Sequence, residues 1–516
     1  MNGCEATCSH VVDNIQVLSR VGVVKTRKAF VYSGGVIRDN IFFYNNSLSV
    51  VQRALVERLY LVKGKMGFVP CPKPTTSFST LNYFKKAVRR GLRATPSAWT
   101  TEEFVQSYAG SQRNRYASAA ATYSMRGVRR SDGYLKTFIK AELYNGTSKN
   151  NPCPRLIQPR TPVYNVAIGR FLRPVEKLIY KAIDSVFEHH VVLKCDNMWQ
   201  RARTIKQYWD EFENPVFVGL DASRFDQHVS AAALEFEHSL YNEMFRDPEL
   251  ARLLKWQINQ KGFANMVDGV VRYTVEGCRA SGDMNTALGN VFLMCALSHN
   301  FLRSLGVKYR FINDGDDCGV FMEKQHLHLL SALPEHHLQY GFEMEVEAPA
   351  YELESIEFCQ CRPVQLTQTE WMMVRNIHKA MAHDWVVLTT RDWATTEEVL
   401  VATARCGLSL YADVPILSEM YTAMSRFPCR ENVVNKILQA EFSGTGRTWR
   451  LFASRNRPYA VDETIARVSI YKAFGILPDL QMHLEEHYRA FTPASIEFNK
   501  RSITSYSTDR EQYIFD

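Results

Sequence analysis

The chain has 516 residues, of which 46% are hydrophobic and 22% charged, and its formal net charge is +8. This composition excludes disordered and fibrous proteins, and it allows several domains or one large enzyme built of interlocked subdomains. The mild positive charge is compatible with a polyanionic partner. No apolar run of membrane-spanning length and no signal peptide is apparent. The twelve cysteines are scattered without paired CxxC motifs, which is typical of reduced thiols in a cytosolic protein.

The first 80 residues show few strong patterns. Residues 1–40 lack periodicity and are interpreted as an extension or linker, whereas residues 45–62 have apolar side chains at helical spacing. Pro70, Pro72 and Pro74 predict a stiff, extended connector.

Five basic residues follow this connector within nine positions, and their spacing places several on one face of a helix. Such a face is suited to contacts with the phosphates of RNA, although a solvated helix face fits the same pattern. These candidate RNA-binding residues are Lys85, Lys86, Arg89, Arg90 and Arg93.

Residues 126–177 contain eleven Lys or Arg against three acids. The Asn, Gly, Ser and Pro content of residues 145–152 predicts a loop within this basic region. Residues 164–184 then predict an amphipathic helix that Pro174 should kink or divide.

Residues 215–220 predict a buried strand, and two acids, Asp221 and Asp226, follow at its end. Residues 231–245 predict a helix. Residues 261–276 predict a hairpin around the Asp268-Gly269 dipeptide.

Residues 281–290 form a polar loop that leads into an apolar helix. Thr286 and Asn290 are four residues apart, so they share one face of that helix. For Ser281, Thr286 and Asn290, ordinary helix capping is the alternative to a functional role.

Residues 309–322 predict a β-hairpin in which Asp314 and Gly315 favour a tight turn. The next residues, Asp316 and Asp317, are adjacent carboxylates that repel each other, and a divalent cation such as Mg²⁺ relieves this repulsion. Taken alone, a solvated Asp-rich turn fits equally well. If Asp221 converges with this turn at one sheet edge, three carboxylates can hold two Mg²⁺ ions roughly 3.5–4 Å apart.

Residues 324–340 predict a helix interrupted near Pro334, and residues 341–347 and 355–361 predict strands. The resulting order of strand, helix, hairpin, helix and strand fits an antiparallel sheet backed by helices. Residues 371–490 read as mainly helical, and residues 504–516 show no periodicity.

The D-x4-D motif at Asp221, the SG-x3-T-x3-N motif at Ser281 and the GDD motif at Gly315 resemble, in this order, motifs A, B and C of viral RNA-dependent RNA polymerases. The sequences in and around these motifs are similar to those of polymerases of tombusvirus-like and carmovirus-like plant viruses (Tombusviridae). The resemblance covers about residues 30–480, and it extends to residues 44–48, 55–58, 155–160 and 358–361.

This resemblance implies an α/β (α+β) right-hand fold with fingers, a palm with a ferredoxin-like antiparallel sheet plus helices, and a helical thumb. The implied divisions are an N-terminal extension (1–40), fingers with motif F at about 140–160 (41–214), palm with motif A (215–240), a fingers insertion (241–276), palm with motifs B to E (277–370), thumb (371–500) and a flexible tail (501–516).

The resemblance also implies RNA-directed RNA synthesis, in which two Mg²⁺ ions, with Mn²⁺ as a substitute, are held by Asp221, Asp316 and Asp317. The implied nucleotide-binding residues are the ribose-contacting Asp226, Thr286 and Asn290, the loop residues Ser281 and Gly282, and the motif F residues Lys140, Arg155, Arg160 and Lys149. Motif E would hold the primer end through Cys359. Many relatives use a lysine of motif D as general acid, but none lies between Lys324 and Lys379, where His336 and His337 are the alternatives.

The implied partners are template and product RNA, NTPs, and a viral auxiliary replicase protein that carries the membrane anchor. The implied location is therefore the host cytoplasm, at membrane-associated replication complexes. A reverse transcriptase and a non-catalytic RNA-binding replicase subunit are the alternatives. Asp226, where reverse transcriptases commonly have an aromatic residue, disfavours the first, and three retained, mutually repelling carboxylates disfavour the second.

Overall fold

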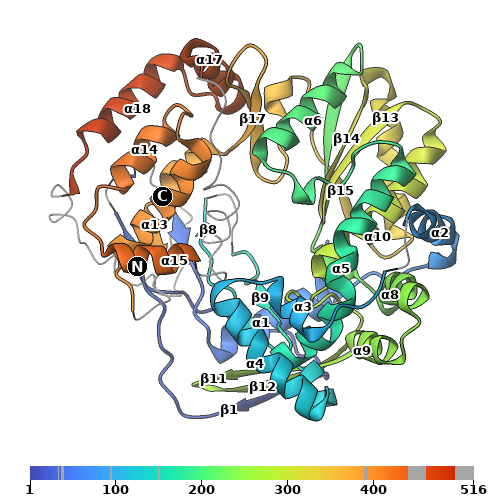
Figure 1. The fold of residues 1–516 in the computed structure, drawn as a ribbon. Coiled ribbons are helices and arrows are strands. Elements are labelled where there is room, and N and C mark those ends of the chain that lie inside the picture. The colour runs from blue at the N-terminus through green and yellow to red at the C-terminus, as the bar shows by residue number, and fades with distance from the viewer. Residues whose placement is uncertain are drawn as a thin grey trace.

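The computed structural model describes residues 1–32, 34–35, 40–92, 96–147, 151–388, 393–439 and 461–493. The candidate residues Arg93 and Lys149 and the expected tail, residues 501–516, lie outside these ranges. The described part is a mixed α/β structure, as the sequence predicted (Figure 1).

A four-stranded antiparallel sheet lies at the centre of the site described below. Its strands, in spatial order, are β13 (Tyr309–Asp314), β14 (Asp317–Glu323), β10 (Pro215–Ala222) and β15 (Met344–Val346). The chain passes through β10, α10 (Thr286–Leu302), the β13–β14 hairpin, α11 (Leu333–Leu338) and β15. The predicted order of strand, helix, hairpin, helix and strand is confirmed.

Strand β10 is apolar because both faces of the sheet are covered. Val216, Val218 and Leu220 belong to the core that also contains the apolar helix α10. Phe217, on the opposite face, packs in a second cluster with residues of α6 (Met198–Asp210). A strand that is buried on both faces has a continuous run of apolar residues. This run is why the strand could be predicted from the sequence.

Helix α5 (Pro162–Phe187) continues through Pro174 and is not divided there. Its apolar face packs in the main core, and it contacts α2 (Asn82–Gly91), α3 (Thr101–Gln106) and α4 (Gly110–Arg126). The packing of this apolar face offsets the free-energy cost of a proline inside the helix. The prediction from Pro174 alone did not take this packing into account.

A second four-stranded sheet contains the hairpin predicted for residues 261–276. Its spatial order is β1 (Ile15–Ser19), β12 (Gly269–Glu276), β11 (Asn259–Met266) and β6 (Leu135–Lys136). The residues between the paired ends of the hairpin are Val267 and Asp268.

Residues 1–40 are not merely a linker, which corrects the expectation for this segment. Strand β1 pairs with β12 over five residues, and β2 (Ala29–Val31) pairs with β18 (Val386–Leu388). Most side chains of β1 are exposed, so it has no alternation of apolar and polar residues to reveal it. Its partner strand is distant in the sequence.

The C-terminal part is mainly helical, as predicted, and Figure 1 shows α13 to α18, in orange and red, grouped apart from the central sheet. Its helices are α12 (Ile377–His383), α13 (Thr396–Tyr411), α14 (Leu417–Met424), α15 (Glu431–Gln439), α17 (Glu463–Phe474) and α18 (Pro478–Ala490). They share one apolar core with β16 (Cys361–Gln365) and β17 (Trp371–Arg375).

The remaining elements connect these parts. They are β3 (Ile41–Phe42), α1 (Leu48–Leu55), β4 (Leu61–Gly64), β5 (Gly67–Pro70), β7 (Phe138–Ile139), β8 (Tyr144–Asn145), β9 (Leu156–Ile157), α7 (Phe225–His228), α8 (Ala231–Phe245) and α9 (Pro248–Ile258). Within the described ranges, no helix combines the length and apolar character needed to cross a membrane.

Candidate active site

Four carboxylates form a row across the central sheet. Asp221 of β10 lies directly opposite Asp317 of β14, which in turn lies opposite Asp314 of β13, and on its other side Asp221 lies opposite Glu345 of β15. Side chains that are directly opposite in antiparallel strands share a face, with Cβ atoms roughly 4.5–5.5 Å apart. The predicted meeting of Asp221 with the acids of the hairpin is therefore confirmed. Glu345 was not expected, because strand register cannot be read from the sequence.

The turn of the hairpin presents Asp316 at its exposed tip. Gly315 has φ +97° at the first turn position, as in a type II′ turn, and a side chain at this position would be strained. The Asn313 amide fixes the turn by donating to the Gly315 carbonyl at 2.8 Å and accepting from the Gly315 N–H at 3.0 Å. The predicted tight hairpin is confirmed, but its two central residues are Gly315 and Asp316, because Asp314 pairs with Asp317 as the last residue of β13.

The carboxylates of this row differ in their electrostatic surroundings. Lys194 Nζ lies 2.8 Å from an oxygen of Asp314, and Arg201 forms an ion pair with the same carboxylate. Asp317 is exposed at the end of β14, but partial desolvation, followed by the charges of Asp316, Asp314 and Asp221, raises its pKa above the usual value. A cation near Asp317 would relieve this repulsion.

The donor chemistry of the row fits a hard divalent ion. Carboxylate oxygens are the ligands that Mg²⁺ prefers. In the described part of the chain, however, no group of three or more His, Cys, Asp or Glu side chains is already arranged around a metal position. Asp221, Asp316 and Asp317 are the residues that could hold such ions.

A hollow of about 550 Å³ brings many of the predicted residues together. Asp221, Asp316 and Asp226 contribute the acids of its lining, while Lys140 and Arg155 contribute positive charge. Both cations also lie near Glu142, at 3.0 and 3.7 Å respectively. The hollow therefore combines carboxylates and cations, the charges needed to bind a metal–triphosphate complex.

Three arginines that were not predicted as site residues also line this hollow, namely Arg58, Arg224 and Arg279. Arg58 donates to the Cys153 carbonyl at 2.9 Å, and Arg224 donates to the Glu57 carbonyl. Arg224 lies between the two acids of the D-x4-D motif, and this position could have indicated that it lies near the site. Arg58 belongs to residues 55–58, to which the resemblance extends, but no role was assigned to it there.

Asp226 lies at the end of a chain of hydrogen bonds. Asn290 Nδ2 donates to Asp226 at 2.9 Å, Arg279 Nε donates to Asn290 Oδ1 at 3.1 Å, and Arg279 forms an ion pair with Glu237. The predicted proximity of Asp226 and Asn290 is confirmed. Thr286 does not join them, because its hydroxyl donates to the Ala280 carbonyl at 2.9 Å.

Burial raises the pKa of Asp226 to about 6, against the opposing effects of Asn290 and Arg279. The folded state therefore keeps its proton to higher pH than the unfolded state does. The resulting stabilisation is present below about pH 4 and is lost as the pH rises through about 6.

Asp226→Asn keeps the acceptor for Asn290 but cannot ionise. We expect its free energy of unfolding, relative to wild type, to increase by about 1 kcal/mol between pH 5 and pH 7.5. Urea unfolding at both pH values measures this difference. A difference that does not change with pH would show that the pKa of Asp226 is not raised.

The loop after β12 is anchored to the basic segment. The Ser281 carbonyl accepts from the Gln158 N–H at 2.7 Å, and both residues line the hollow. Gly282 has φ +128°, and a Cβ there would lie 3.2 Å from the Pro159 nitrogen. The backbone at Gly282 therefore packs closely against Pro159 of the same chain.

Arg160 does not line the hollow, which corrects its assignment as a nucleotide-binding residue. Its side chain is 0% exposed and pairs with Asp283, and its guanidinium also donates to the Gly133 carbonyl and, at 2.6 Å, to Gln260. A guanidinium with these buried partners holds the loop that follows Ser281. The sequence shows its charge but not its buried partner, Asp283.

The RNA-binding face predicted on α2 is wrong for the buried Lys85, whereas for the exposed Lys86 and Arg90 it stays a prediction. Lys85 is buried and pairs with Glu243 of α8 at 2.6 Å, and Arg89 pairs with the same carboxylate at 3.2 Å. These charges join two helices, because α2 packs against α5, α8 and α10. Lys86 and Arg90 are exposed but do not line the hollow.

Cys359 lies beside the hairpin but is not in a strand. Residues 359 and 360 have φ +52° and +60° and form a tight turn closed by two hydrogen bonds between Phe358 and Cys361. The strand predicted for residues 355–361 is wrong, since β16 begins at Cys361. Cys359 Sγ lies 3.6 Å from Asp314, which links this turn to the acidic row.

The two histidines named as alternatives to the motif D lysine are poorly placed for proton donation. His337 is buried, and burial lowers its pKa to about 3. Burial also lowers the pKa of His336, which contacts Asn300. Neither residue lines the hollow.

Comparison with known proteins gives one consistent result. A family model described as viral RNA dependent RNA polymerase matches residues 15–495. The RNA-directed RNA polymerase of Melon necrotic spot virus is 38% identical over 480 residues, which cover 91% of this chain and 59% of that protein. The corresponding protein of Tobacco necrosis virus (strain D) is 39% identical, covering 93% and 66%, and that of Turnip crinkle virus is 37% identical, covering 86% and 57%. The chain thus spans about three fifths of the length of these relatives.

Proposed function

Because this chain belongs to the viral RNA-dependent RNA polymerase family, as its motifs predicted, we propose that it catalyses templated RNA synthesis from NTPs. In this proposal it transfers nucleotides to an RNA 3′-hydroxyl and so replicates a positive-strand viral genome. One observation carries the proposal: Asp221 and Asp316 line the same hollow as Lys140 and Arg155. The acids suit metal-assisted chemistry at the α-phosphate, and the cations suit the triphosphate.

Asp221, Asp316 and Asp317 would hold two Mg²⁺ ions, or Mn²⁺ in their place. When bound, such ions lower the pKa of an attacking hydroxyl and neutralise the leaving pyrophosphate. The chain itself contributes position and charge. Lys140, Arg155 and the unexpected Arg58 and Arg224 would orient the triphosphate, while the rigid hairpin turn sets the position of Asp316.

We also propose the right-hand arrangement for the described elements. The sheet β13-β14-β10-β15 with α10 and α11 would be a palm with a ferredoxin-like sheet, spanning residues 215–240 and 277–370. Residues 41–214 and 241–276 would form the fingers, and the helical group of residues 371–500 the thumb. Limited proteolysis that releases a stable fragment with ends far from these boundaries would contradict this division.

The hydrogen bond from Asn290 to Asp226 supports RNA, rather than DNA, as the product. An Asp226–Asn290 pair can bond the ribose 2′-hydroxyl, and dNTPs would leave these polar groups unpaired. We expect Asp226→Ala to reduce the preference for NTPs over dNTPs by about 10- to 100-fold, mainly by raising KM for NTPs. Single-nucleotide incorporation with matched NTP and dNTP pairs measures this ratio, and Thr286→Val serves as a control because its hydroxyl contacts Ala280. An unchanged ratio in Asp226→Ala would refute the ribose contact.

One assay tests the proposed activity against the two rival functions. Wild type and Asp316→Ala are incubated with an RNA template, Mg²⁺, and either NTPs or dNTPs. The proposal predicts NTP incorporation by wild type alone. Efficient dNTP incorporation would indicate a reverse transcriptase, and a wild type without incorporation that still binds RNA would indicate a replicase subunit without catalysis.

From the family resemblance, we further propose an auxiliary viral replicase protein that carries the membrane anchor. The chain would then act in the host cytoplasm at membrane-associated replication complexes, through that partner or an upstream segment. Co-expression with the auxiliary protein of the same virus followed by membrane flotation tests this proposal. Flotation that is equal with and without the auxiliary protein would contradict recruitment by that partner.

A further inference from the structure

The outer face of the second sheet carries basic, aromatic and amide side chains, in one row across its four strands and in a shorter row on β11 and β12. In the first row, Arg272 of β12 lies opposite both Gln16 of β1 and Phe263 of β11, and Phe263 lies opposite Lys136 of β6. In the second row, Lys261 lies opposite Thr274. We call this face the sheet platform, and its residues are Gln16, Arg272, Phe263, Lys136, Asn14, Thr274, Lys261 and Tyr134.

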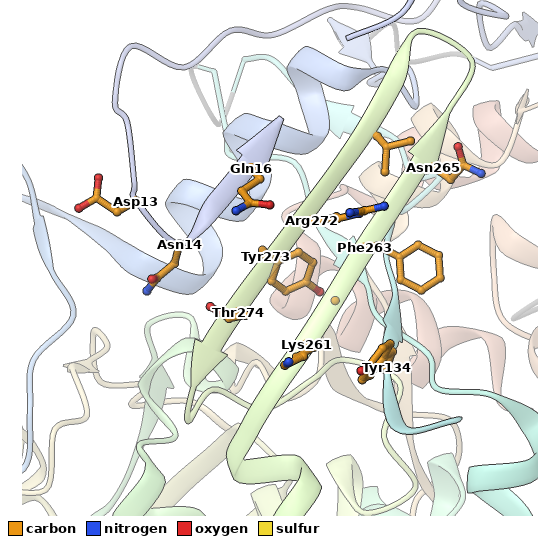
Figure 2. Close-up of a pocket in the computed structure, with 12 residues that line it drawn as sticks. Asp13, Asn14, Gln16, Tyr134, Lys261, Phe263, Asn265, Arg272, Tyr273 and Thr274 are labelled. Carbon is orange, nitrogen blue, oxygen red and sulfur yellow. The ribbon is translucent and has the colours of Figure 1, made fainter. Parts of the chain in front are cut away.

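The sheet platform surrounds a hollow of about 710 Å³, and Figure 2 shows its lining side chains along β1, β11 and β12 and beside Tyr134. Among the residues that the structure describes, none lines both this hollow and the acidic one. Tyr273 lines the hollow at the platform, and its hydroxyl accepts a hydrogen bond at 2.7 Å from Gln158, which lines the acidic hollow. The two hollows are therefore different sites separated by a thin layer of protein.

The cations of the sheet platform are available to an anionic ligand. Lys261, Arg272 and Lys136 are exposed, and among the described residues no ion pair engages their side chains. Asp13 is the one acid among the lining residues, so the platform is positively charged. A face with this charge attracts phosphates rather than acidic protein surfaces.

The aromatic and amide side chains add contacts that suit a base. Phe263 and Tyr134 are half-buried, so each keeps part of its ring accessible. Bases of single-stranded RNA stack on such rings, and amides such as those of Gln16 and Asn14 bond base edges. Paired bases of a duplex have no free faces to stack in this way.

We propose that the sheet platform is a binding site for single-stranded RNA outside the active-site hollow. Arg272 and Lys261 contact phosphates, Phe263 stacks on a base, and the face accommodates two or three unpaired nucleotides. Four-stranded sheets with exposed aromatic residues bind RNA by the same physical means. The inference rests on the proposed function in taking the RNA to be the template of this enzyme.

Fluorescence anisotropy of the full chain with a labelled single-stranded 20-nucleotide RNA, in EDTA and without NTPs, tests the proposal. We expect Phe263→Ala to weaken binding by about 5- to 100-fold. The double variant Arg272→Gln/Lys261→Gln should reduce the slope of log K against log salt by about 1.4, because each lost phosphate contact in a single strand contributes about 0.7. Lys255→Gln, on the exposed surface of α9, is the matched control and should bind as wild type does.

Crosslinking locates the bound RNA directly. A 4-thiouridine-containing RNA should crosslink to peptides that contain Phe263 or Tyr134, and the double variant should lose these crosslinks. Unchanged affinity and salt slope in all platform variants would overturn the proposal. Variants that bind RNA normally but lose association with an auxiliary replicase protein would also overturn it, and would identify a protein interface.

The outcomes separate this inference from the proposed function. Binding is measured without NTPs or metal, whereas the proposed function is tested by nucleotide incorporation by wild type. If wild type incorporates nucleotides and the platform variants bind RNA as tightly as wild type does, the RNA-binding role of the platform is refuted and the proposed function is not. Crosslinks at Phe263 without any incorporation would support the platform and reject the polymerase.

Discussion

Asp316→Asn is expected to lower the rate of nucleotide incorporation by about 10³-fold, which corresponds to roughly 4 kcal/mol of lost transition-state stabilisation. Asp316 lies at the exposed tip of the hairpin turn and lines the acidic hollow. Asparagine preserves the shape of the side chain but removes the charge that would hold a divalent ion. The loss should therefore appear in kcat more than in KM for NTPs.

The same substitution is not expected to destabilise the metal-free protein. Asp316 raises the pKa of Asp317 through repulsion, so its removal should leave the thermal midpoint in EDTA unchanged or higher. Single-turnover incorporation and thermal unfolding measure the two effects, and Asp479→Asn on the exposed surface of α18 is the control. A variant that is inactive and also strongly destabilised would assign Asp316 to structure rather than chemistry.

Arg160→Ala is expected to have the second large effect, a decrease of about 3–5 kcal/mol in the free energy of unfolding. Arg160 and Asp283 have side chains that are 0% and 3% exposed, so removal of either partner leaves the other charge buried. Asp283→Ala should cost a similar amount. The double variant should cost less than the sum of the two, because no unpaired charge remains.

Urea unfolding of the two single variants and the double variant measures this coupling. Arg155→Ala is a matched control, because its side chain is 55% exposed and it belongs to the same basic region. If Arg160 instead contacted the triphosphate, Arg160→Ala would raise KM for NTPs and leave the unfolding free energy unchanged. That outcome would support the prediction from the sequence that Arg160 binds the nucleotide.

The sequence predicted the features that local patterns encode. The apolar run before Asp221 and the tight turn at Gly315 identify a strand and a hairpin from adjacent residues alone. The apolar helix after the Ser281 loop was located in the same way. These are the elements that place Asp221, Asp316 and Asp317 at one site, so the acidic core of the site was predictable.

The features that were predicted wrongly or not at all depend on partners that are distant in the sequence. Lys85 and Arg160 read as surface cations, but Glu243 and Asp283 neutralise them in the interior. Strand β1 obtains its hydrogen bonds from β12, and Glu345 joins the acidic row through strand register. Burial of a charge and pairing of an edge strand are properties of the assembled fold, and a single sequence without its contacts does not contain them.

A shared metal site can be measured by divalent ion binding, because Asp221 of strand β10 and Asp316 of the hairpin turn would hold the same ions. Mn²⁺ is titrated into wild type, Asp221→Asn and Asp316→Asn in the absence of RNA and NTPs, and bound Mn²⁺ is measured by electron paramagnetic resonance. We expect wild type to bind Mn²⁺ and each single variant to bind it with an affinity lower by about 10-fold or more. Equal Mn²⁺ binding by all three proteins would contradict a metal site shared by these acids.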